Sequence, residues 1–181
     1  MTRDDRLDSA IRRIPHHPKP GILFYDLMPL FQDGDALAAA VGAMAEWGAP
    51  RTPDLVVGVE ARGFVLGGAL ASSLGVGFAA ARKTGKLPHQ TVRREYALEY
   101  GIDAVEMHRD AVRPGMRVLV HDDLLATGGT ARAACELVED LGGIVVGVAV
   151  IVELTFLPGR EALAERDVLS LLTYDDEAVP A

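Results

Sequence analysis

The fold of this chain is decided by one stretch, Val118-Leu119-Val120-His121-Asp122-Asp123-Leu124-Leu125-Ala126-Thr127-Gly128-Gly129-Thr130. It begins with an apolar run typical of a buried strand, continues through two carboxylates and reaches a glycine turn. After the turn, apolar residues at helical spacing mark one helix face and two glycines end the helix; these residues are Ala134, Leu137, Val138, Leu141, Gly142 and Gly143. A strand, a glycine turn and a helix in this order predict a unit of a parallel α/β sheet.

The turn itself has the composition of a phosphate-binding loop. Gly128 and Gly129 allow backbone N–H groups to converge on an anion. Thr127 and Thr130 supply hydroxyls, and the positive end of a helix follows directly. No Lys follows the glycines as in a Walker loop, and the glycine spacing does not fit dinucleotide binding. We therefore predict that the loop from Ala126 to Thr130 holds a phosphate group.

The two acids before the loop limit which kind of ligand the loop can bind. Asp122 and Asp123 would repel a phosphate if they faced it, so they must face hydroxyls or a metal ion. A pentose with a phosphate at its far end meets both conditions, because the loop can hold the 5'-phosphate while the carboxylates accept hydrogen bonds from the 2'- and 3'-hydroxyls. The alternative is an ordinary strand-to-helix turn with acidic capping residues. The strand, acid pair and helix together favour a ribose 5-phosphate site.

Outward from this stretch, strands and helices alternate along the chain. The expected strands are 55–59, 76–81, 117–121 and 144–152, and the expected helices are 7–14, 33–47, 64–74 and 130–141. This order predicts an α/β fold in one domain, 1–181, with a central, mostly parallel twisted sheet flanked by helices. Ligands of such sheets bind at the carboxyl ends of the strands.

The stretch from Arg82 to about Arg113 shows no sustained period. It contains charges, Gly85, Pro88 and Gly101. A long irregular connection inside a compact domain is usually functional, so we predict a mobile active-site lid at about 82–108.

Composition excludes several classes of protein. The formal net charge of -8 argues against general binding of nucleic acid, which needs a broad basic face. No uncharged apolar run approaches the length of a membrane span, so no membrane partner is expected. The lone cysteine, Cys135, cannot form an internal disulfide, and the N-terminus lacks a signal-peptide pattern. These features predict a cytoplasmic protein.

Several segments, in order, resemble the type I phosphoribosyltransferases. The 118–130 stretch is similar to the phosphoribosyl pyrophosphate motif of that family, in the form found in its adenine-specific members. Further matches are Pro20-Gly21-Ile22-Leu23-Phe24-Tyr25-Asp26, Glu60-Ala61-Arg62-Gly63-Phe64, Arg82-Lys83-Thr84-Gly85-Lys86-Leu87-Pro88, Leu98-Glu99-Tyr100-Gly101, Val152-Glu153-Leu154-Thr155 and Gly159-Arg160-Glu161. They extend from about residue 20 to residue 172, nearly the whole chain. The resemblance implies transfer of a phosphoribosyl group to adenine, giving AMP and pyrophosphate, by a homodimer.

The resemblance also implies roles for particular residues. The region 1–32 would carry a helix and the base-binding segment, with Leu23, Phe24 and Tyr25 binding adenine through main-chain groups. Glu99 would be the general base, with a solvated loop acid as the alternative. The groups expected at pyrophosphate are Ala61, Arg62, Gly63, Arg82, Lys83 and Lys86. Arg62 also stands out by itself, since it lies between an apolar strand and a glycine.

A divalent cation is expected as well. Pyrophosphate carries more negative charge than the few basic residues expected at the site of an acidic protein would neutralise, which indicates Mg²⁺ held mainly by substrate oxygens and water. The sequence contains no His or Cys cluster of the kind that binds transition metals, so no protein metal site is predicted.

Two positions depart from the family pattern. Tyr25 stands where Arg is usual, and His121 stands where the strand normally has an aliphatic residue. We interpret His121 as a half-buried strand histidine without a ligand role. Two alternative functions are a 6-oxopurine phosphoribosyltransferase, which only the family motifs disfavour, and a non-catalytic relative. The latter should have lost Arg62 or one of the paired acids Asp122 and Asp123, and all three are present.

Overall fold

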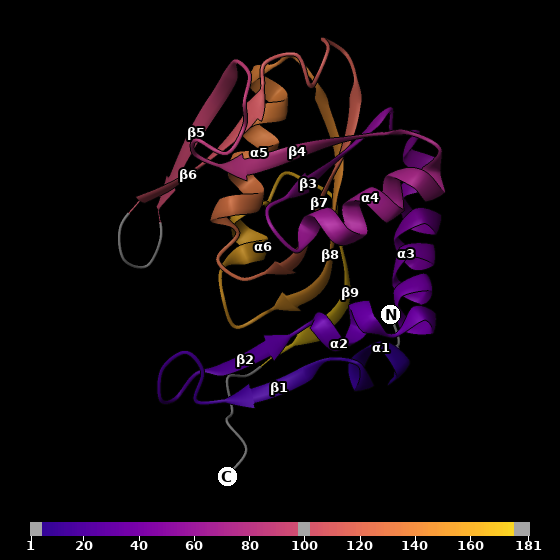
Figure 1. Cartoon of the computed structure of the whole chain (residues 1–181), viewed down its shortest axis with the longest axis vertical. Coiled ribbons are helices and arrows are strands. Elements are labelled where there is room, and N and C mark those ends of the chain that lie inside the picture. Colours follow the sequence, from indigo (N-terminus) through magenta and orange to yellow (C-terminus); the bar gives the residue numbers. More distant parts are fainter. Residues whose placement is uncertain (1–4, 98–101, 176–181) are drawn as a thin grey trace.

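The computed structural model describes residues 5–97 and 102–175, which form a single α/β domain. Its main sheet has seven strands in the order β5-β6-β4-β3-β7-β8-β9 (Figure 1). Their bounds are β3 Leu55–Val59, β4 Gly77–Lys83, β5 Thr91–Ala97, β6 Ile102–His108, β7 Arg117–Leu125, β8 Ile144–Leu154 and β9 Val168–Tyr174. The five strands from β4 to β9 in this order are parallel to one another, whereas β5 and β6 are antiparallel to their neighbours. The predicted mostly parallel sheet is therefore confirmed.

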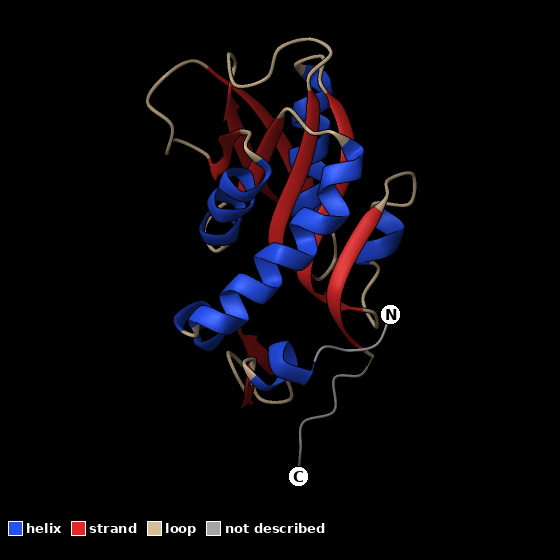
Figure 2. Cartoon of the chain, turned by 90° about the vertical axis from the view of Figure 1, so that its right-hand side faces the viewer, coloured by secondary structure: helices blue, strands red, loops and turns tan. Residues whose placement is uncertain are grey.

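Helices cover both faces of this sheet (Figure 2). They are α1 Asp5–Ser9, α2 Met28–Gln32, α3 Gly34–Gly48, α4 Gly63–Leu74, α5 Gly129–Asp140 and α6 Gly159–Ala162, with a 3₁₀ turn η1 at Ala49–Arg51. One apolar core lies between the sheet and α5, and a second lies between the sheet and α1, α3 and α4. Within the described ranges, no helix is both long and apolar enough to span a bilayer.

Local signals account for several predicted boundaries. Asp33 caps α3, because its carboxylate accepts hydrogen bonds from the backbone N–H groups of Asp35 and Ala36. Gly75 ends α4 in a left-handed conformation, with φ +70°. Most of β8 is buried, as its continuous apolar run predicts for a parallel strand covered on both faces.

The N-terminal region differs from its prediction. The expected helix 7–14 is only α1, and the following residues form β1, Arg12–Pro15. This strand pairs antiparallel with β2, Leu23–Asp26, so that Ile14 lies opposite Phe24. The apolar spacing that indicated one helix instead divides between two elements, with Leu7 and Ile11 buried in the same core. The pairing with β2 is not visible in the spacing of either segment.

The stretch after Arg82 is also more regular than predicted. Here β5 and β6 form an antiparallel hairpin with a continuous register from Thr91 opposite His108 to Ala97 opposite Ile102. The interpretation of 82–113 as a connection without sustained periodicity therefore missed the two strands β5 and β6. Residues 98–101, which include the predicted base Glu99, lie outside the described residues. A mobile lid at 82–108 stays a prediction.

Candidate active site

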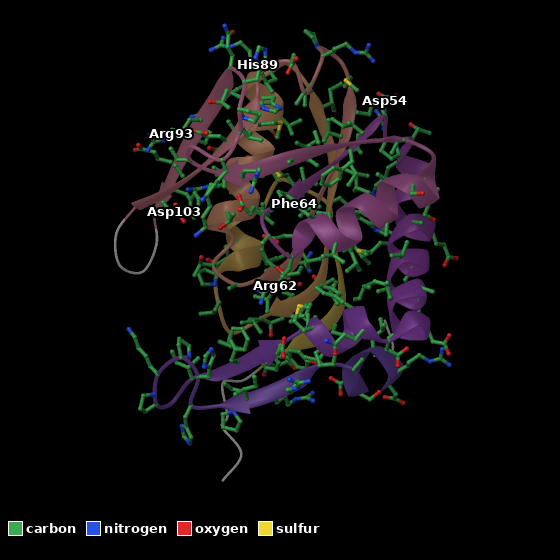
Figure 3. The ribbon with its side chains drawn as sticks, in the orientation of Figure 1. Asp54, Arg62, Phe64, His89, Arg93 and Asp103 are labelled. Atoms are coloured by element: carbon green, nitrogen blue, oxygen red, sulfur yellow. The ribbon has the colours of Figure 1, made fainter. Side chains whose placement is uncertain are left out.

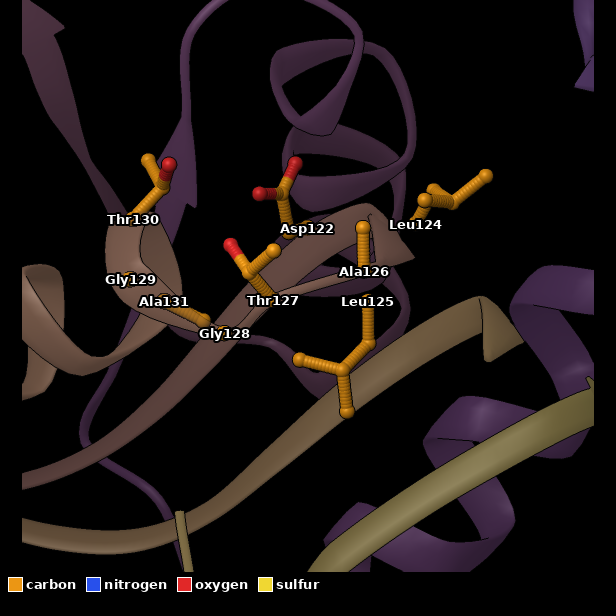
Figure 4. A pocket seen from close by; sticks show the side chains of 9 residues that line it. All are labelled: Asp122, Leu124, Leu125, Ala126, Thr127, Gly128, Gly129, Thr130 and Ala131. Atoms are coloured by element: carbon orange, nitrogen blue, oxygen red, sulfur yellow. The ribbon is translucent and has the colours of Figure 1, made fainter. Parts of the chain in front are cut away.

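The phosphate loop connects β7 to α5 at the carboxyl end of the parallel sheet. A pocket of about 80 Å³ lies there, and it is lined by Asp122, Leu124, Leu125, Ala126, Thr127, Gly128, Gly129, Thr130 and Ala131. Figure 4 shows the oxygen atoms of Asp122, Thr127 and Thr130 on one side of the loop, while Leu125 points to the other. All five residues predicted to hold the phosphate thus line one pocket with one of the predicted acids.

Gly128 gives the loop its shape. It precedes α5 with φ +79°, a conformation that other residues rarely adopt. A Cβ at this position would lie 2.7 Å from the carbonyl oxygen of Gly159 and 2.8 Å from Cβ of Ala162. The glycine is therefore required both for its backbone angle and for close packing against α6.

The paired acids lie inside β7, which runs four residues beyond the predicted end at His121. The parallel pairing with β8 continues through Asp122 opposite Val150, which keeps the chain extended despite its charges. Adjacent strand residues ordinarily point to opposite faces, yet the carboxyl groups of Asp122 and Asp123 remain close enough to interact with each other. Asp122 lines the phosphate pocket, whereas Asp123 is buried with 5% of its surface exposed.

Electrostatics distinguish the two acids. Burial raises the pKa of the Asp122 carboxyl well above its ordinary value, and the neighbouring Asp123 carboxylate adds to the effect. The backbone N–H of Asp123 donates a hydrogen bond of 2.9 Å to Oδ1 of Asp122. Asp123 instead forms an ion pair, with its Oδ2 2.5 Å from Nε of Arg62. One predicted ribose ligand therefore faces the pocket and the other holds a predicted pyrophosphate ligand.

Arg62 and Gly63 stand at the start of α4, opposite the phosphate loop. A Cβ at Gly63 would lie 3.1 Å from the carbonyl oxygen of His121 and 3.2 Å from Oδ1 of Asp122. This close approach brings the segment from Ala61 to Gly63 against β7. Figure 3 labels Arg62 at this end of α4. The structure thus brings the predicted pyrophosphate segment and the acid pair together.

The basic residues that follow β4 have partners of their own. Arg82 donates to both carboxylate oxygens of Glu60, at 3.1 and 3.0 Å, and the pKa of Glu60 is lowered chiefly by this pair. Nζ of Lys83 lies 3.5 Å from Oδ2 of Asp103. Lys86 is exposed. In this conformation, therefore, only Arg62 of the four predicted basic side chains contacts an acid of the β7 pair.

Tyr96 is a candidate that the sequence did not indicate. Its side chain is buried, its hydroxyl donates to Oδ2 of Asp103 at 3.2 Å, and it also hydrogen-bonds to Thr130 of the phosphate loop. Burial raises the pKa of this phenol. Tyr96 therefore connects the hairpin to the phosphate loop. The sequence signal that could have identified Tyr96 is the strand alternation in β5, which places Val92, Arg94 and Tyr96 on one face. Because Arg94 is charged, this face does not stand out as apolar in the sequence.

The predicted base-binding segment forms β2. Leu23 and Phe24 are partly buried, and the Phe24 ring contacts His17 edge to face with centroids 5.0 Å apart. Tyr25 is buried and stacks on Tyr174, with centroids 4.2 Å apart and the rings 8° from parallel. Because Tyr174 is the last residue of β9, this stack holds the β1–β2 hairpin at the carboxyl end of the sheet.

His121 is more deeply buried than predicted, with no exposed surface. Its Nδ1 lies 2.9 Å from the carbonyl oxygen of Ala149, so Nδ1 carries the proton that is donated. Burial lowers the pKa of His121 to about 4. It is a core residue beneath the acid pair. Among residues 5–97 and 102–175, no three His, Cys, Asp or Glu side chains gather in a group that could bind a metal.

Comparison with known proteins identifies the class to which this fold and site belong. The phosphoribosyl transferase domain family matches residues 25–171. The chain belongs to this family. The match contains the end of β2, the whole parallel sheet except the end of β9, and the phosphate loop.

Solved structures place the similarity with one branch of the family. The adenine phosphoribosyltransferase of Thermoanaerobacter pseudethanolicus has 48% identity and a TM-score of 0.91, over 94% of this chain and 99% of that one. The enzyme of Rhodothermus marinus has 49% identity and a TM-score of 0.89, over 94% and 97%. The enzyme of Saccharomyces cerevisiae, solved with an imino-altritol bisphosphate and adenine, has 38% identity and a TM-score of 0.88, over 92% and 97%. The resemblance inferred from the motifs is thereby confirmed.

Proposed function

We propose that this protein transfers the 5-phosphoribosyl group of phosphoribosyl pyrophosphate to adenine, forming AMP and pyrophosphate. The observation that carries the proposal is the pocket at the end of β7, where the phosphate loop and Asp122 share one cavity. Arg62, paired with Asp123, stands beside it. Similarity to adenine phosphoribosyltransferases along nearly the whole chain supports adenine as the acceptor.

The reaction is a displacement at the anomeric carbon of the ribose. N9 of adenine forms a bond to this carbon, the bond to the pyrophosphate oxygen breaks, and its electron pair leaves with pyrophosphate. The phosphate loop holds the 5'-phosphate, and Asp122 accepts a hydrogen bond from a ribose hydroxyl. Arg62 pairs with the negative charge of the departing pyrophosphate. Catalysis thus depends on positioning and on the charge of the leaving group.

The basic residues must be released from acids before they can meet pyrophosphate. Arg62 is paired with Asp123, and Arg82 with Glu60. Pyrophosphate would replace the carboxylate at Arg62 and free Asp123 for the second ribose hydroxyl. Lys83 and Lys86 would add charge from the segment after β4. We assign the proton on the adenine ring to Glu99 as general base, on the resemblance alone.

Mg²⁺ is proposed as the cofactor, bound mainly by substrate oxygens and water. The fit rests on Asp122, an oxygen ligand of the kind this ion prefers, in a pocket that also takes phosphate. When bound, Mg²⁺ neutralises charge on pyrophosphate. The chain's own carboxylates orient the ribose and the water around the ion.

Closure of the 82–108 segment over substrate is also proposed. The hairpin is attached to α5 near its middle, because Arg94 of β5 donates to both carboxylate oxygens of Asp140 on α5, at 2.7 and 2.6 Å. Hydrogen exchange on residues 82–108 should increase in protection when phosphoribosyl pyrophosphate and Mg²⁺ are added. Equal, strong protection with and without them would contradict the lid.

A homodimer in the cytoplasm completes the proposal. Val65 on α4 and Phe78 on β4 expose 49% and 39% of their surfaces, and Phe64 packs edge to face on Phe78. These side chains suit an apolar contact between two copies. Sedimentation should give a dimer that Val65→Glu weakens; a wild-type monomer at micromolar concentration would refute it. Cys135 is free and buried, in keeping with a reducing compartment.

A nucleobase panel tests the function. Adenine, hypoxanthine and guanine would each be incubated with phosphoribosyl pyrophosphate and Mg²⁺, and pyrophosphate release measured. We expect release with adenine and little with the 6-oxopurines, because their exocyclic group and N1 reverse the donor and acceptor pattern of adenine. Arg62→Gln should reduce the rate, whereas Arg109→Gln, an exposed arginine outside the site, should not. Faster release with hypoxanthine or guanine would refute adenine as the acceptor.

A further inference from the structure

An ionic cluster around a buried carboxylate stands behind the phosphate loop, with Glu153 buried and Arg160 half-exposed. Glu153, near the end of β8, has 3% of its surface exposed and lies in register with Leu125, the last residue of β7. Arg160 of α6 donates from Nε to Oε1 of Glu153 at 2.9 Å and pairs with the second oxygen through Nη2. The hydroxyl of Ser170 on β9 donates to the same carboxylate at 2.5 Å.

Arg160 also ties α6 to the sheet edge. Its Nη1 donates to the carbonyl oxygen of Val168 at 2.8 Å, and its Nη2 lies 3.2 Å from Oγ of Ser170. One side chain thus bonds to two strands, β8 through Glu153 and β9 through Val168 and Ser170. A short helix of four residues has little stability of its own, so this guanidinium fixes where α6 lies.

The N-terminus of α6 packs directly on the phosphate loop. A Cβ at Gly159 would overlap the carbonyl oxygen of Ala126 and lie 2.9 Å from Cγ of Leu125. From the other side, a Cβ at Gly128 would lie 2.7 Å from the carbonyl oxygen of Gly159. Two backbones therefore meet without side chains between them, and a displacement of α6 must displace the loop.

We propose that Arg160 is a positioning residue for the phosphoribosyl group: held by Glu153 and Ser170, it sets α6 against the loop from Ala126 to Gly128 and so keeps the loop's N–H groups directed at the 5'-phosphate. The inference rests on the proposed function. Arg160 itself need not touch the substrate. Its effect falls on the phosphoribosyl ligand and leaves the adenine end, on β2, unchanged.

The test compares two arginine–glutamate pairs. Arg160→Met keeps the length of the side chain but removes its charge and hydrogen bonds. Arg166→Met is the matched control, because Arg166 donates to both oxygens of Glu139, at 2.9 Å each, and neither residue lines the pocket. Arg160→Lys keeps the positive charge beside Glu153 but not the forked contact. This milder variant serves if Arg160→Met does not fold.

Two measurements decide the outcome. Calorimetry with ribose 5-phosphate alone should show the Kd rising at least tenfold in Arg160→Met, severalfold in Arg160→Lys and less than twofold in Arg166→Met. Steady-state kinetics should show the KM for phosphoribosyl pyrophosphate rising while the KM for adenine stays within twofold. Unchanged ribose 5-phosphate binding in Arg160→Met or Arg160→Lys, or a parallel rise in both KM values, would overturn the proposal. Because calorimetry needs no acceptor base, it tests the role of Arg160 even if the wild type does not use adenine.

Discussion

The two ends of the site are built in different ways. At the phosphate end, the groups that meet the ligand belong to the turn that leads from β7 of the main sheet into α5, and glycines set their positions through backbone packing. At the base end, the segment Leu23–Asp26 belongs to a separate two-stranded sheet. Side chains hold that sheet in place: Tyr25 stacks on Tyr174, the Tyr174 hydroxyl donates to Asp8 at 2.7 Å, and Arg13 donates to the same carboxylate at 2.8 Å.

This difference indicates how each end tolerates change. Where two backbones pack directly against each other, there is no space for an added side chain. A single methyl group at the phosphate end should therefore cause a large loss of stability and activity. At the base end, a stacked aromatic pair and the ion pairs around it provide several partly redundant contacts. Substitutions there should therefore change folding stability more than catalytic activity. We expect the largest losses of activity at the phosphate end and the smallest at the base end.

The largest effect is expected from Asp122→Asn combined with Asp123→Asn. Each lost charged hydrogen bond is worth ~1.5 to 3 kcal/mol, so the pair should lower kcat/KM by about 10² to 10⁴-fold. Folding stability at neutral pH should fall far less. The pKa of Asp122 is raised in the folded state, so its ionised form opposes folding above the ordinary pKa, and Asn removes that penalty.

Activity assays and urea unfolding of the double variant measure these two quantities separately. Turnover close to wild type would show that the acids are capping residues and would remove the ribose assignment. The single variants then divide the effect between the pocket-lining carboxylate and the one paired with Arg62.

The phosphate end was also the part that the sequence predicted best. Glycines, hydroxyls and acids close together in sequence at the end of a buried strand are local signals, and a single strand-to-helix turn brings them together. The different surroundings of Asp122 and Asp123 were missed because the strand was ended at His121, although parallel pairing with β8 carries it to Leu125. At the base end the residues were identified through the resemblance. Their attachment to Tyr174 joins positions 149 residues apart in sequence, which no local pattern contains.

Glycine substitutions compare the two ends directly. Gly128 and Gly21 both have positive φ, +79° and +90°, but a Cβ at Gly21, in the β1–β2 turn, would meet nothing within 4 Å. Gly21→Ala should cost about 1 to 2 kcal/mol of unfolding free energy from backbone strain alone. Gly128→Ala adds steric overlap with Gly159, about 1 to 3 kcal/mol more, and should abolish ribose 5-phosphate binding. Equal losses in urea unfolding would show that the packing against α6 is not tight.

Acid should weaken the phosphate end through His121. This group has a pKa of about 4 in the folded protein and about 6.5 when unfolded, so it favours the folded state above pH 6.5 and the benefit disappears as pH falls toward 4. Between pH 7 and pH 5 it should account for roughly 2 kcal/mol of lost stability. His121→Val should lack this part of the slope, measured by urea unfolding at the two pH values. Parallel slopes would mean that His121 is not buried as a neutral ring.

The smallest effect is expected from Tyr25→Arg at the base end. The Tyr25 side chain turns into the stack with Tyr174 and is buried there, so the residue can meet adenine only through its main chain. Readout of N1 and the exocyclic amino group by main-chain N–H and C=O groups does not depend on that side chain. The ratio of kcat/KM for adenine to that for hypoxanthine should therefore change by less than about tenfold, or ~1.4 kcal/mol.

Folding stability of Tyr25→Arg should fall, because an arginine would replace the stacked ring beside Arg13, whose guanidinium already lies 5.2 Å from the Tyr174 ring centre. Tyr25→Phe, which keeps the stack, is the control and should retain specificity. Should Tyr25→Arg instead reverse the preference in favour of hypoxanthine, the side chain at position 25 would be setting specificity, and the contrast between the two ends would no longer hold.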